Sequence, residues 1–154
     1  MFQNDLKRLA TILPALTFLL LAGCGGKEAV APEEVEQAAF NDLRSKVIDV
    51  VPDPQQQETI LGLVDVLQSD FSKLRKDVVV RRTELRKLNS DYDSTREQFH
   101  DYVERYDAEI KLSREKVTAS HQKLLITTTV DEWDALKKAD SKTMKKLVGL
   151  LQSI

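Results

Sequence analysis

Residues 64–106 decide the fold, and they read VDVLQSDFSKLRKDVVVRRTELRKLNSDYDSTREQFHDYVERY. Apolar residues recur in this stretch at alternating steps of three and four, with Arg81 and Thr95 in the two places where the repeat lacks one. The apolar positions are Val64, Leu67, Phe71, Leu74, Val78, Leu85, Leu88, Tyr92, Phe99, Tyr102 and Tyr106. A strand would alternate with a period of two, so this spacing predicts coiled-coil-like helix packing along one seam.

The seam continues beyond this stretch, and no glycine or proline interrupts the chain between Gly62 and Gly149. A further four-residue step, which locally unwinds a supercoil, leads to the next seam positions. These positions are Ile110, Val117 and Leu124. Asp53 is placed to cap a helix that begins at Pro54, with Gln56 completing a capping box. We therefore expect one long helix over about 54–126, roughly 110 Å in length.

The weakest part of that helix is Asn89–Thr95, because its short polar side chains compete with the backbone for hydrogen bonds. The alternative fold is a four-helix up-down bundle with a turn near residues 89–91. The heptad repeat passes through the polar stretch in phase, and this favours the continuous helix.

Two shorter helices are expected to pack against the long one. The first runs over about 32–51, with Phe40, Leu43, Val47 and Val50 on its apolar face, and Pro52 ends it. Thr129 and Glu132 form a capping box that opens the last helix. The apolar face of this last helix carries Trp133, Leu136, Leu147, Leu150 and Ile154. The prediction is an all-α, elongated helical bundle over residues 32–154.

Composition agrees with a helical chain and excludes several classes of protein. The 154 residues fit a single domain and include only 5 glycines, 4 prolines and 1 cysteine. These are too few turn-forming residues for an all-β fold and too few thiols for a disulfide framework or a thiolate metal site. The net charge of -2 gives no reason to expect nucleic-acid binding, which needs a basic face.

The first two dozen residues have the pattern of a secretory signal. Lys7 and Arg8 precede an apolar stretch over 9–21, whose length of about 20 Å is short of the roughly 30 Å hydrocarbon core. The following residues, Leu21-Ala22-Gly23-Cys24, resemble the bacterial lipobox. This resemblance implies cleavage between Gly23 and Cys24, and acyl chains on Cys24 as the membrane anchor.

The resemblance also implies an order of segments and a location. Residues 1–23 are the expected signal peptide, and 24–31 are the lipidated cysteine with a short tether. In enteric bacteria the inner-membrane retention signal is an aspartate after the cysteine, and Gly25 stands there instead. The expected location is therefore the periplasmic face of the outer membrane, with the membrane as a partner through the lipid anchor.

Charges along the predicted long helix are segregated. Residues 73–87 carry seven basic and two acidic side chains, whereas residues 91–109 carry seven acidic and two basic ones. Folding back near residue 90, or antiparallel pairing of two copies there, would set opposite charges together. An ordinary solvated face with chance clustering is the competing explanation.

In a continuous helix the seam at Leu85, Leu88, Tyr92 and Phe99 stays bare, so we expect it to bind a second copy or an envelope protein.

The sequence carries no set of residues that indicates an enzyme. Glu97 and His100 have the spacing of a di-iron carboxylate pair, but this pair occurs once where such a site needs it twice. His121 has no carboxylate three or four residues away, and no phosphate-binding loop or nucleophile elbow is present. We therefore expect no catalytic residues, no metal, no cofactor and no small-molecule substrate.

Two non-enzymatic functions remain. The first is a structural or adaptor lipoprotein that docks a partner through its helical surface. The second is a periplasmic chaperone or an envelope-stress or metal sensor. Residues 126–133 are faintly similar to the motif that precedes helices in Spy- and CpxP-type periplasmic proteins, although the motif itself is not present. Binding of unfolded client proteins would distinguish the second function from the first.

Overall fold

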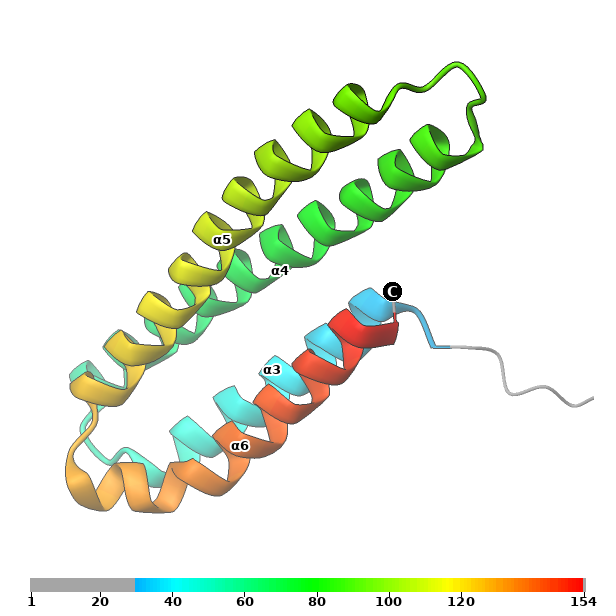
Figure 1. Cartoon of the computed structure of the whole chain (residues 1–154). Coiled ribbons are helices and arrows are strands. Elements are labelled where there is room, and N and C mark those ends of the chain that lie inside the picture. The colour runs from blue at the N-terminus through cyan, green and yellow to red at the C-terminus, as the bar shows by residue number, and fades with distance from the viewer. Residues whose placement is uncertain (1–29, 154) are drawn as a thin grey trace, which may run out of the picture. The chain divides into compact units, whose positions relative to one another are not determined.

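The computed structural model describes residues 30–153, and its four helices form one compact unit that begins at Pro32. The helices are α3 (Pro32–Val50), α4 (Pro54–Ser90), α5 (Arg96–Thr127) and α6 (Val130–Ser153) (Figure 1). The part of the chain that the structure describes contains no strand, so the all-α prediction is confirmed. The predicted signal peptide and lipobox, together with Ile154, lie outside the described residues.

The continuous helix over 54–126 is wrong, because α4 ends at Ser90 and the chain folds back into α5. Within the turn, the Asp93 amide donates to the Asp91 carboxylate at 3.0 Å. Thr95 then caps α5 in a reciprocal capping box with Gln98, with hydrogen bonds of 3.2 and 2.8 Å. Short polar side chains thus replace helical hydrogen bonds over these residues, and the alternative four-helix bundle is the fold adopted.

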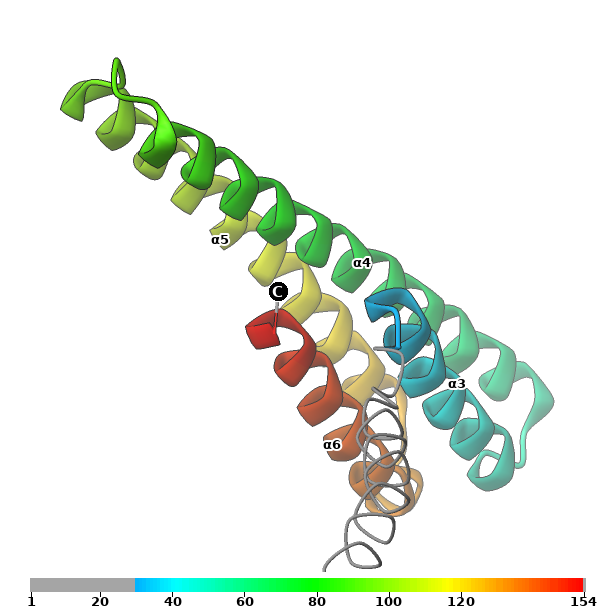
Figure 2. The ribbon, with the colours of Figure 1, turned by 90° about the vertical axis from the view of Figure 1, so that its right-hand side faces the viewer.

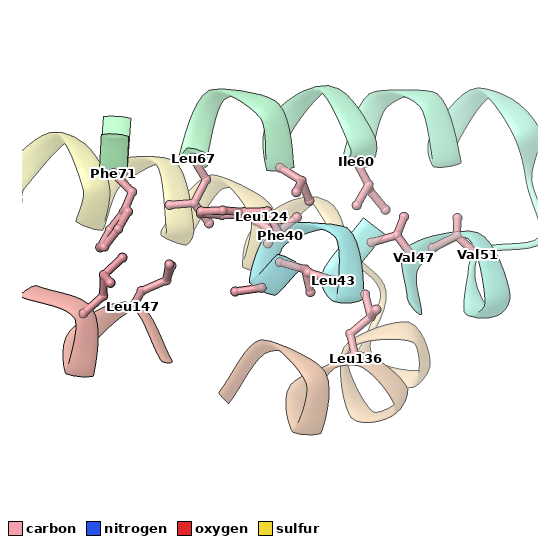
Figure 3. Packing of buried hydrophobic residues seen from close by; sticks show 13 residues of the cluster. Phe40, Leu43, Val47, Val51, Ile60, Leu67, Phe71, Leu124, Leu136 and Leu147 are labelled. Carbon is pink, nitrogen blue, oxygen red and sulfur yellow. The ribbon is translucent and has the colours of Figure 1, made fainter. Parts of the chain in front are cut away.

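The four helices are arranged as two antiparallel pairs. The long pair is α4 with α5, and the shorter pair, α3 with α6, covers one face of it near the end where the chain passes from α3 to α4 (Figure 2). We call this four-helix part the base. Its hydrophobic core consists of Ala39, Phe40, Leu43, Val47, Val51, Ile60, Val64, Leu67, Phe71, Leu124, Leu136, Leu147 and Leu150 (Figure 3). The apolar faces predicted for the two short helices therefore meet the seam of the long pair.

At the closed end of the base, the two inter-helix connections are joined by side chains. Asp53 caps α4 by accepting from the Gln56 amide at 2.7 Å. The Gln56 side chain does not complete the predicted capping box, because it donates instead to the Glu132 carboxylate at 2.9 Å. Thr129 and Glu132 form the predicted capping box of α6, with hydrogen bonds of 2.8 and 3.3 Å.

The other end of α3 is fixed by a buried ion pair. Arg75 of α4 donates to Glu36 at 2.8 Å and to Glu33 at 2.7 Å, and the side chains of Arg75 and Glu36 are only 7% and 4% exposed. Ser72 also donates to Glu36. Coverage of α4 by α3 ends about one turn beyond this ion pair, where Pro32 and Glu33 border Val79 and Val80.

Candidate functional site

Beyond the base, α4 and α5 continue as a pair toward their turn, with the end of α6 beside only its lower part (Figures 1 and 2). We call residues 76–112 the projecting hairpin. From Arg75 to the end of α4 at Ser90 it extends roughly 22 Å. None of its residues belongs to the hydrophobic core of the base. The hairpin therefore depends on contacts between its own two helices, and it presents surface that the base would otherwise bury.

Polar contacts connect the two helices of the hairpin. Arg81 pairs with Asp107 at 2.7 Å, and its carbonyl accepts from the Tyr102 hydroxyl at 3.1 Å. Ser113 donates to Asp77 at 2.6 Å. The segregated charges are thus brought face to face within one chain, with Arg81 and Asp107 as an ion pair across the hairpin. Arg81 is a polar seam residue, whereas Thr95, the other position where the apolar repeat is broken, is a helix cap.

Two side chains in these contacts have shifted pKa values. Partial burial, together with the neighbouring Tyr106 hydroxyl, raises the pKa of the Tyr102 phenol well above its usual value. Partial burial also acts to raise the pKa of Asp77, but hydrogen bonds from Lys73 and Ser113 outweigh it, so the pKa of Asp77 is lowered. Asp77 is therefore ionised and Tyr102 neutral at physiological pH, and neither is poised for acid–base chemistry.

One face of the hairpin continues the face that α3 and α6 cover in the base. On α4 its apolar positions follow the seam through Leu74, Val78 and Leu85 toward Leu88, and on α5 they run from Ile110 back to Val103 and Phe99. Steps of three, four and seven residues keep each row on one side of its helix. We call the hollow between these two rows the trough.

The lower part of the trough is a groove of about 560 Å³ that borders the end of α6. Its apolar lining comes from Leu74, Val78, Leu85, Ile110, Val148 and Leu151, and its cations are Arg81, Arg82 and Arg114. The upper part is a shallower hollow of about 540 Å³ near the turn, lined by residues that include Leu88, Phe99 and Val103. Three helices thus surround an apolar groove with three guanidinium groups at its borders.

The four predicted surface residues lie on the hairpin but differ in exposure. Leu85 and Leu88 are partly buried at the trough, and Phe99 is 39% exposed there. Tyr92 is fully exposed in the turn and takes no part in a helix seam. Arg82, Arg114 and Val103 also line the trough and were not among the predicted surface residues, although their spacing from Val78 and Ile110 places them on the same helix faces.

Neither histidine is placed as a metal ligand. His100 is exposed and lies 3.7 Å from Glu104. His121 of α5 forms a 2.8 Å hydrogen bond with Asp140 of α6, and its ring meets Trp133 edge-on. Within residues 30–153, no cluster of three or more His, Cys, Asp and Glu side chains could hold a metal ion.

The folded hairpin removes the reason for expecting an antiparallel homodimer about residue 90. That expectation depends on a bare seam in one continuous helix. In the hairpin, the basic part of α4 already lies beside the acidic part of α5 of the same chain.

Comparisons with known proteins add no relative: no family model matches the chain, and no curated protein or solved structure is significantly similar to it. None of the helices among the described residues combines the length and apolar character needed to cross a membrane.

Proposed function

We propose that this protein is a lipid-anchored bacterial envelope lipoprotein with a non-enzymatic adaptor role. The lipobox-like residues Leu21-Ala22-Gly23-Cys24 support the anchor at Cys24, and Gly25 supports the outer membrane as its location. The fold supports the adaptor role, because the base is a closed core whereas the hairpin carries an uncovered helix-packing face.

That uncovered face is the observation on which the adaptor role depends. In the base, seam residues of α4 and α5 reach complete burial, with Leu67 at 0% and Leu124 at 1% exposure. Along the hairpin the same rows reach Phe99, which is 39% exposed. Leu85, Leu88 and Val103 in these rows are half-buried, and partly exposed apolar side chains gathered on one face favour an interaction site there. The hairpin is thus the docking element and the base its support.

The polar groups of the described residues favour binding over catalysis. His121 and Asp140 bond each other, as do Asp77 and Ser113. Since no His or Cys side chain lies among the residues lining the lower groove, this groove offers neither a general base at neutral pH nor a thiol nucleophile. A partner held by shape and charge needs neither.

The anchor is tested by the Cys24→Ser variant. Labelling with a fatty-acid analogue should mark the unaltered protein and not the variant, and the variant should leave the membrane fraction. A variant that remains acylated would contradict the lipobox assignment.

The docking role is tested by a photo-crosslinking amino acid placed at Leu88 or Phe99 in growing cells. Both hairpin positions should capture the same envelope protein. Ile48, which is 55% exposed on α3, serves as the control and should capture none. Equal capture at all three positions, or none at the hairpin, would refute this role. Many client proteins of different mass at the hairpin would instead favour the chaperone function.

A further inference from the structure

The lower part of the trough has features that specify its occupant. Its two rows of apolar side chains are direct continuations of the rows that receive α3 and α6 in the base. A surface that accepts a helix at one end keeps the same ridges and spacing one heptad further along. The geometry therefore suits a helix in the groove better than an extended peptide, which would need an unpaired sheet edge.

The length of the free face sets the length of that helix. From Arg75 to Ser90 the hairpin rises roughly 22 Å, so an added helix has room for at most about four turns. Val148 and Leu151 of α6 line the groove together with Val78 and Leu85, so an added helix would lie beside the last turns of α6 and continue past its end toward the turn. It would cover the hairpin as α6 covers the base.

The charges at the groove specify the polar side of that helix. Arg81, Arg82 and Arg114 border the apolar lining, while no acidic side chain lines the groove. Arg81 is paired with Asp107, whereas among the described residues Arg82 and Arg114 form no ion pair with a carboxylate. Two free guanidinium groups beside apolar side chains are suited to bind carboxylates in a partner.

We propose that the trough of the projecting hairpin binds an amphipathic helix of a partner protein, at most about four turns long, whose apolar stripe is flanked by aspartate or glutamate. This inference rests on the proposed adaptor function and names the chemistry of its partner. A second copy of the chain is not the expected occupant, because the basic part of α4 already lies beside the acidic part of α5 in the same chain. An acyl chain is disfavoured because three guanidinium groups border the groove, whereas apolar ligands bind in sites with few polar groups.

The test uses two synthetic helical peptides of 18 residues with the same leucine stripe, one flanked by glutamate and the other by lysine. Fluorescence anisotropy measures their binding to the full chain carrying Cys24→Ser. The glutamate peptide should bind at least tenfold more tightly than the lysine peptide. Equal binding of both peptides, or binding of neither, would overturn the inference.

Charge reversal then locates the site. The double variant Arg82→Glu and Arg114→Glu should invert the preference, so that the lysine peptide becomes the tighter ligand. The control variant Lys138→Glu and Lys145→Glu changes the net charge equally on exposed positions of α6 that do not line the groove, and should keep the preference for glutamate. Equal effects of the two double variants would refute the assignment to the groove. Circular dichroism confirms that both variants keep their helix content.

Two further measurements exclude the other occupants. Arg82 and Arg114 should not make the full chain carrying Cys24→Ser bind vesicles of phosphatidylglycerol. If the chain binds these vesicles and the double variant Arg82→Glu and Arg114→Glu does not, a lipid surface is favoured instead. Sedimentation of the Cys24→Ser chain tests for a second copy. A dimer that the double variant Arg82→Glu and Arg114→Glu abolishes would favour self-association, and we expect none. If crosslinking at the hairpin succeeds while the glutamate peptide fails, the adaptor function stands and only this partner chemistry is wrong.

Discussion

Replacing Arg75 with methionine should destabilise the protein by about 3–5 kcal/mol, because it leaves a buried carboxylate without its cation. Glu36 is 4% exposed, and Arg75 supplies its charged partner at 2.8 Å, with Ser72 as the other hydrogen-bond donor. Methionine retains much of the side-chain volume, so the loss reports the charge and not a cavity. Against a total of about 5–15 kcal/mol for a typical domain, such a loss is large.

The matched control is Arg44→Met, which removes another ion pair between α3 and α4. Arg44 pairs with Asp65 at 2.6 Å, but Asp65 is 65% exposed, so the expected cost is about 1 kcal/mol or less. Urea unfolding followed by circular dichroism measures both variants. The double variant Arg75→Met and Glu36→Gln should recover at least half of the loss. Equal costs for Arg75→Met and Arg44→Met, or additive effects in the double variant, would refute the reasoning.

Three further expectations concern the base, the turn and the contact between α5 and α6. Leu67→Ala, at a fully buried site, should lower the stability by about 2–5 kcal/mol, whereas Leu85→Ala in the hairpin should lower it by about 1 kcal/mol. Thermal unfolding measures both variants, and similar losses of stability would contradict the division into base and hairpin. Thr95→Ala removes the cap of α5 and should cost about 1 kcal/mol, with faster amide exchange confined to the turn. The hydrogen bond to Asp140 raises the pKa of His121, although partial burial opposes this shift. The contribution of this pair to the free energy of unfolding is therefore full below about pH 6.5 and is lost as pH rises through the raised pKa. His121→Asn should remove this dependence from urea unfolding measured between pH 5 and 9, and an unchanged pH profile would show that the pair is not the cause.

Much of the base could be predicted from the sequence, because its signals are local. The apolar face of α3, with Phe40, Leu43 and Val47, is spaced at three and four, and all three residues are buried. Pro52 and the Thr129–Glu132 capping box identify the two connections at its closed end within a residue or two. Such signals need no knowledge of which helix packs against which.

The turn between α4 and α5 was missed because the heptad phase is kept across it. A repeat that continues in phase is compatible with one helix, and equally with two helices that fold back on each other. What decides between them is the competition of Asp91 and Thr95 with the helical backbone. The residues Thr95-Arg96-Glu97-Gln98 spell a capping box, and this was the signal that could have located the start of α5.

The candidate site was harder to predict because its parts come together only after the chain folds back. Leu85 and Leu88 belong to the seam in either fold, but the groove also needs Ile110 of α5 and Val148 of α6, which lie far away in the sequence. Folding also decides what the segregated charges can do. Arg81 and Asp107 satisfy each other across the hairpin, whereas Arg82 and Arg114 border the uncovered groove. The same charge pattern that stabilises the hairpin thus leaves two cations free beside an apolar surface, and this combination makes an acidic, amphipathic helix the partner that the hairpin would accept.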